Sequence, residues 1–251
     1  MPVSELHAKV ASVALAAAAP HGFALGGGNA LLAHGIITRP TQDLDLFTDQ
    51  EHGVQAAAAA VEEALRTAGF QVEREDQAGD LADLFPGMGE ELAEWIVTSP
   101  DGQELTVQLA YFDRDRDPVA MDVGPVLDLQ DVAGGKVCAL ASRVEPRDYA
   151  DTAAILDRYS PADLISFARR LDPGLTASDF ADAGRQLDQI SDRAFARYGL
   201  TPADIAVLRD RFTAWPRTAR LADARPPAAE PPERTPSDRH AEPGREPESG
   251  R

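Results

Sequence analysis

The chain has 251 residues, of which 43% are hydrophobic and 26% charged, and its formal net charge at pH 7 is −18. This length fits one large domain or two small ones, and the apolar content is enough for a core. So acidic a chain argues against broad nonspecific binding to nucleic acid, which depends on neutralising phosphates. The single cysteine, Cys138, excludes an intramolecular disulfide framework and fits the reducing cytoplasm. No apolar run approaches the ~20 residues of a membrane span, so no membrane attachment is predicted.

The most informative stretch follows a predicted amphipathic helix at residues 3–19. A short apolar strand at 23–25 runs into three glycines, and a small helix is predicted at 29–34. A polar link then leads to a second strand that carries Asp43 and Asp45 between leucines. Because side chains alternate along a strand, the two aspartates share one face. Neighbouring carboxylates repel unless a cation lies between them, and magnesium is the simplest such ion.

The glycines and the aspartates together predict a nucleotidyltransferase. Glycines between a strand and a helix let the backbone pass close to a ligand, and a helix N-terminus favours an anion. One half of the stretch therefore suits phosphate and the other suits magnesium, which is the layout that clamps a nucleoside triphosphate for attack on its α-phosphate. A Walker loop is excluded, since no Gly-Lys-Ser/Thr follows. Each half alone has a plainer interpretation, as an ordinary turn or a polar strand edge.

The rest of the chain supplies more strands and then helices. A helix at 54–67 and a strand at 70–74 are followed by a polar segment at 76–89, predicted to be a mobile loop that packs near or covers the site. Two strands at 94–97 and 105–111 flank the Asp-Gly turn of a hairpin. Helices are predicted from residue 128 to 143 and from 146 onward, and then at 160–171, 176–191 and 201–215.

These elements define an α+β protein. Residues 1–127 are predicted to form a nucleotidyltransferase-like mixed sheet flanked by helices, and residues 128–222 a helical domain. From 223 to 251 the chain is rich in Pro, Glu and Arg and has no apolar periodicity. That tail cannot bury enough surface to fold and is predicted to be disordered.

A cluster of basic residues is predicted to meet the triphosphate. Lys136 and Arg143 are seven residues apart and lie on one helix face. With Arg39 they can neutralise phosphate charge and the charge that develops during transfer. Asp148 and Asp151 share a face of the next helix, and they are predicted to pair with Arg143 or Arg147 and to orient Lys136 and Arg143. The alternative is an interhelical salt-bridge network without chemistry.

Both regions resemble the AbiEii/AbiGii-type nucleotidyltransferase toxins of the DNA polymerase β-like superfamily. The first motif matches at Leu25, Gly27, Gly28, Ala30, Leu31, Arg39, Asp43, Leu44, Asp45 and Leu46. The second matches at Lys136, Ala139, Leu140, Arg143, Pro146, Arg147, Asp148 and Asp151. The second match is the more specific one, because five polar positions agree at fixed spacing.

The resemblance implies a magnesium-dependent transfer of a nucleotide from a nucleoside triphosphate to an acceptor, with tRNA as the expected acceptor. It implies the toxin half of a toxin–antitoxin pair, and so a cognate antitoxin. The implied metal ligands are Asp43 and Asp45. The implied catalytic set is Asp43, Asp45, Lys136, Asp148 and Asp151, and the implied nucleotide-binding set is Gly27, Gly28, Asn29, Arg39, Lys136 and Arg143.

Two departures from the family pattern leave alternatives open. Asn29 stands where the family usually has Ser or Thr, although its amide can also bind a phosphate oxygen. Gln108 stands where the family strand brings a third carboxylate, and a glutamine is neither charged nor a base. Glu104 or Asp113 can substitute only if the strand bends. The alternatives are a nucleotide-binding relative without catalysis, or a nucleotidyltransferase acting on a small cationic molecule.

Overall fold

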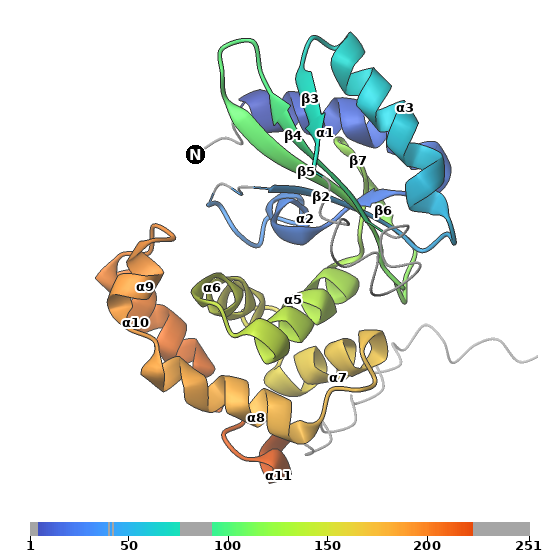
Figure 1. The fold of residues 1–251 in the computed structure, drawn as a ribbon. Coiled ribbons are helices and arrows are strands. Elements are labelled where there is room, and N and C mark those ends of the chain that lie inside the picture. The colour runs from blue at the N-terminus through green and yellow to red at the C-terminus, as the bar shows by residue number, and fades with distance from the viewer. Residues whose placement is uncertain (1–4, 40, 42, 76–91, 223–251) are drawn as a thin grey trace, which may run out of the picture.

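The computed structural model describes residues 5–39, 41, 43–75 and 92–222, which form a mixed sheet with its helices and a helical part beside it (Figure 1). The predicted α+β class, with a mixed sheet first and helices after it, is confirmed. The predicted loop at 76–89 and the predicted tail from 223 lie outside the described residues.

The described sheet has seven strands in the order β3-β4-β5-β2-β1-β7-β6, so β2 lies at its centre. Strand β2 pairs with β5 in parallel, as β1 does with β7, and the other neighbours are antiparallel. The strands are β1 (Ala24–Leu25), β2 (Asp43–Thr48), β3 (Gln71–Arg74), β4 (Leu92–Thr98), β5 (Glu104–Tyr111), β6 (Val119–Met121) and β7 (Gly124–Val126).

Alternation along the strands separates a core face from a polar face. Leu44 and Leu46 are fully buried, as are Trp95 on β4 and Val107 on β5. Helices α1 (Glu5–Ala18) and α3 (Gly53–Thr67) contact the sheet and cover this apolar face (Figure 1). The other face of the same strands carries the polar residues, so the period of two directs both aspartates of β2 away from the core.

The helical part starts beside the sheet and turns away from it (Figure 1). Its helices are α5 (Leu129–Arg143), α6 (Pro146–Ile155), α7 (Pro161–Leu171), α8 (Ala177–Gln186), α9 (Asp192–Ala196), α10 (Pro202–Arg211) and α11 (Ala219–Ala222). Capping boxes at Ser160 and Thr201, each followed by proline, fix two of the helix starts. The helix predicted at 176–191 is wrong in length, since α8 ends at Gln186 and a 3-10 turn, η3 (Leu187–Gln189), follows.

Short elements complete the described chain. Helix α2 (Gly27–Ala33) lies between β1 and β2, and 3-10 turns occur at η1 (Ala19–His21) and η4 (Phe212–Ala214). Buried aromatic rings, among them Tyr149, Phe212 and Trp215, pack the centre of the helical part. Of the helices that the structure describes, none has the length and apolar character needed to cross a membrane.

Candidate active site

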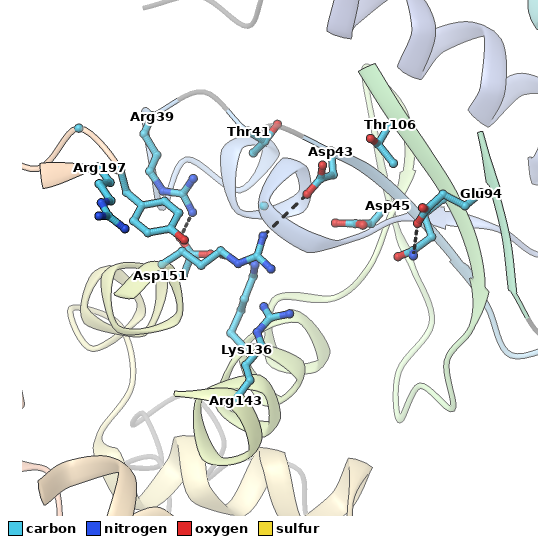
Figure 2. A pocket seen from close by; sticks show the side chains of 15 residues that line it. Arg39, Thr41, Asp43, Asp45, Glu94, Thr106, Lys136, Arg143, Asp151 and Arg197 are labelled. Atoms are coloured by element: carbon cyan, nitrogen blue, oxygen red, sulfur yellow. Dashed lines mark hydrogen bonds and ion pairs between the residues drawn. The ribbon is translucent and has the colours of Figure 1, made fainter. Parts of the chain in front are cut away.

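A cleft of about 680 Å³ opens where the polar face of the sheet meets α5 and α6 (Figure 2). Its lining includes Asp43 and Asp45 from β2, Lys136 and Arg143 from α5, and Asp151 from α6. Two predicted groups of residues that are about a hundred positions apart in the chain therefore line one cavity.

The glycine bend lies directly against one of the paired aspartates. Gly27 has a φ of +55°, in the left-handed region that side chains disfavour. A Cβ built on Gly27 would collide with the Asp45 carboxylate, and the Gly26 amide donates to the Asp45 carbonyl over 2.8 Å. Gly28 lines the cleft itself, whereas Gly27 lies behind the carboxylate. The bend must be glycine to let the carboxylate of Asp45 approach the backbone so closely.

Asn29 fixes the start of the aspartate strand. Its side-chain Nδ2 donates to the Asp43 carbonyl over 2.7 Å, and its Oδ1 accepts from the Thr41 hydroxyl over 2.9 Å. Asn29 is 6% exposed and is not among the residues that line the cleft. The amide thus joins α2 to β2, and its predicted contact with phosphate stays a prediction.

Asp43 and Asp45 point from β2 into the cleft, on the side facing the helices (Figure 2). Burial raises the pKa of Asp45 above its ordinary value, and the nearby Asp43 raises it further. Lys136, Arg147 and Arg143 oppose this shift through their positive charge. Two carboxylates on one face of a strand form a donor set that suits magnesium, which takes one or two carboxylates and completes its shell with phosphates and water.

Asp151 holds two of the predicted cations. It is 1% exposed, its Oδ2 lies 2.8 Å from Lys136 Nζ, and its Oδ1 pairs with Arg39 (Figure 2). Arg39 precedes β2, Lys136 is on α5 and Asp151 is on α6. The buried carboxylate therefore ties the helical part to the sheet and fixes both cations at the edge of the cleft.

Asp148 orients Arg143 in the same way. The carboxylate is fully buried and accepts from Arg143 Nε over 2.9 Å and from Nη2 over 2.7 Å. Such two-pronged pairing adds geometric specificity to the charge attraction. Arg147 pairs with Glu145 at 2.8 Å and reaches across the cleft to 3.9 Å from Asp43.

The structure also brings residues into the cleft that the sequence analysis did not single out. Glu94 on β4 accepts a hydrogen bond from Gln108 Nε2 over 2.9 Å, and both side chains line the cleft (Figure 2). Arg197 and Tyr198, from the link after α9, also line it, and Arg197 lies near Arg39 (Figure 2). Their contribution depends on tertiary packing between distant segments, which no local pattern reveals.

Neither of the two carboxylates proposed as substitutes for Gln108 reaches the cleft. Glu104 pairs with Thr98 at the start of β5, Asp113 lies past the strand end, and both are absent from the lining. In the described part of the chain, no group of three His, Cys, Asp or Glu side chains could hold a metal ion. Asp43 and Asp45 stay the predicted metal ligands.

A mixed sheet with paired aspartates on its central strand, which face basic side chains on the neighbouring helices, is the arrangement of a nucleotidyltransferase. The family model described as the nucleotidyl transferase AbiEii toxin of type IV toxin–antitoxin systems matches residues 13–230. The chain belongs to this family, and the predicted resemblance is confirmed. No curated protein matches the sequence.

Solved structures share the fold. JHP933 from Helicobacter pylori superposes with a TM-score of 0.55 at 16% identity, over 84% of this chain and 92% of that one. A putative nucleotidyltransferase from H. pylori gives 0.53 at 16% identity, over 84% and 94%. MenT4, a nucleotidyltransferase toxin from Mycobacterium tuberculosis H37Rv, gives 0.56 at 16% identity, over 87% and 82%. At such identity the likeness is one of fold.

Proposed function

We propose that this toxin transfers a nucleotide from a nucleoside triphosphate to tRNA, with magnesium held by Asp43 and Asp45. The observation that carries the proposal is the position of this carboxylate pair, which faces Lys136 and the arginines across one cleft. When bound, magnesium would polarise the phosphoryl oxygens and offset their negative charge.

The basic side chains of the cleft are arranged to receive a polyphosphate. Five basic and four acidic side chains line it in the described residues, although the whole chain has a net charge of −18. Asp148 and Asp151 hold Arg143 and Lys136 in place before substrate arrives. Cations fixed in advance stabilise developing charge without the cost of reorganisation during the reaction.

Gly28 brings backbone without a side chain to the lining of the cleft. Gly28 lines the cleft, and a Cβ built on it would lie 2.6 Å from Thr41 Cγ2. The missing side chain lets Thr41 pack against the backbone at Gly28, and both residues line the same cleft as Asp43 and Asp45. We assign the triphosphate to the part of the cleft between Gly28 and Lys136.

The choice of tRNA as acceptor and of a cognate antitoxin as partner rests on the family. Its description names a toxin of a type IV toxin–antitoxin system, and MenT4 is named a nucleotidyltransferase toxin. The proposal places the reaction in the cytoplasm, where tRNA and nucleoside triphosphates are found together. We also propose a domain boundary at residues 127 and 128, because the cleft lies between the sheet and the helices that follow.

Incubation with each α-labelled nucleoside triphosphate, magnesium and total tRNA tests the proposal. Wild-type protein should label tRNA, and a double variant carrying Asp43→Asn and Asp45→Asn should not, at unchanged far-UV circular dichroism. Equal labelling by wild type and double variant would rule the assignment out. Gln108 motivates the second candidate, a nucleotide-binding relative without catalysis, which calorimetry would show as triphosphate binding with no labelled product.

A further inference from the structure

Three polar side chains form a row across neighbouring strands at the floor of the cleft. Asp45 on β2 is in register with Gln108 on β5, and Gln108 is in register with Glu94 on β4. Residues in register on adjacent strands point to the same face of the sheet. All three side chains line the cleft, and the register gives them the order carboxylate, amide, carboxylate.

Gln108 separates the two carboxylates and orients one of them. Its Nε2 donates to Glu94 Oε2 over 2.9 Å, and a carboxylate can only accept in such a bond. Like charges directly opposite each other on adjacent strands destabilise a sheet, so a third acid at position 108 would face acids on both sides. The neutral amide avoids this conflict and holds Glu94 at the cleft.

The spacing places Glu94 outside the metal pair. Two strand spacings separate the backbones of Asp45 and Glu94, which is about 10 Å. In agreement, the described acidic side chains form no group of three that could hold a metal ion. Of the four acids that line the cleft in the described residues, Asp43 and Asp45 are assigned to magnesium and Asp151 is bound to two cations. Glu94 is the fourth acid, and it accepts the hydrogen bond from Gln108.

We propose that Glu94 is the catalytic base that accepts the proton of the attacking acceptor hydroxyl, a role that rests on the nucleotidyl transfer proposed above. The acceptor oxygen forms a bond to the α-phosphorus while its proton moves to the Glu94 carboxylate. The bond between the α-phosphorus and the bridging oxygen breaks, and pyrophosphate leaves with that electron pair. Glu94 later returns the proton to solvent.

The position of Glu94 suits an acceptor that enters beside the bound triphosphate. Lys136, Arg39 and Asp151 lie on the helical side of the cleft, and Glu94 lies at its other end, past Asp45 (Figure 2). An acceptor hydroxyl at that end meets the α-phosphate without displacing the cations that hold the β- and γ-phosphates. The sheet thus provides a proton acceptor although β5 lacks the third carboxylate.

Substitution of Glu94, with chemical rescue, tests this role. Glu94→Gln keeps the side-chain shape but removes the base, and transfer to total tRNA should fall by about 10²–10⁴-fold. The KM for the triphosphate and the magnesium dependence of its binding should stay close to wild type. Glu94→Ala should be equally slow and should regain activity as formate is added, because the small carboxylate can replace the missing base. Glu73→Gln, an exposed glutamate on neighbouring β3, is the matched control and should transfer like wild type.

The outcomes separate this role from the function on which it rests. If wild-type protein labels tRNA and Glu94→Gln does so at a similar rate, Glu94 is not the base and the proposed function stands. Failure of formate to restore Glu94→Ala, or loss of triphosphate binding in Glu94→Gln, would also overturn the role. A wild-type protein that binds triphosphate but labels no tRNA overturns both proposals.

Discussion

Replacing Gly27 with alanine tests whether the glycine bend exists to admit the Asp45 carboxylate. Two costs arise from the added methyl group. The left-handed conformation at φ +55° disfavours any side chain, by about 1–2 kcal/mol. In addition, the new Cβ would occupy the position of the carboxylate oxygen, so the aspartate must turn away.

Gly35→Ala isolates the first of these costs. Gly35 has a φ of +68°, close to that of Gly27, but a Cβ built there meets nothing within 4 Å. We expect this control to lower Tm by about 2–8 °C, since each kcal/mol corresponds to 2–4 °C in a chain of this size. Its site is intact, so transfer at a temperature below both transitions should match wild type.

Gly27→Ala should lose function far beyond its loss of stability. Displacing a metal-binding carboxylate by an ångström is expected to slow transfer by about 10²-fold or more. Thermal unfolding and labelled-nucleotide transfer measured on both variants give the comparison. Transfer by Gly27→Ala within about threefold of Gly35→Ala would refute the reasoning, because the carboxylate would then not depend on the bare backbone.

The remaining predictions concern Asp45 itself, two other carboxylates and the cysteine. Burial raises the pKa of Asp45, so between its ordinary and folded pKa the folded state binds more protons and stability falls as pH rises. Without divalent ions, Asp45→Asn should therefore raise Tm at pH 7, with a gain that vanishes on acidification, whereas added magnesium should stabilise only wild type. Asp151→Asn removes the buried carboxylate that pairs with Lys136 and Arg39, so the free energy of unfolding in denaturant should fall by about 3–5 kcal/mol. Asp157→Asn breaks an exposed ion pair with Arg211 and should lower it by at most about 1 kcal/mol. Burial raises the pKa of Cys138 to about 12, so alkylation of the native thiol at pH 8 should be roughly 10³-fold slower than in urea.

Features set by local periodicity were predictable from the sequence. Asp43 and Asp45 share a face because a strand repeats every two residues, and the burial of Leu44 and Leu46 confirms this. The Asp-Gly turn between β4 and β5 is likewise confirmed, with Gly102 at a φ of +84°. Such features need only a few consecutive residues.

Features set by register and packing were not predictable in this way. Glu94 reaches Gln108 because β4 and β5 pair in one particular register, which the hydrophobic pattern of either strand alone does not specify. Arg197 and Tyr198 line the cleft because α9 and α10, on either side of them, pack against α6. The sequence predicted that Asp148 or Asp151 pairs with Arg143 or Arg147, which is confirmed for Asp148 and Arg143. Asp151 instead pairs with Lys136 and Arg39, because the helical part packs against the sheet.

Anomalous diffraction from crystals grown with manganese and a non-hydrolysable nucleoside triphosphate tests the central claim most directly. The account predicts a manganese peak bound by both Asp43 and Asp45, with the triphosphate between Gly28 and Lys136. Manganese bound elsewhere at saturating concentration, or a triphosphate outside this cleft, would contradict it.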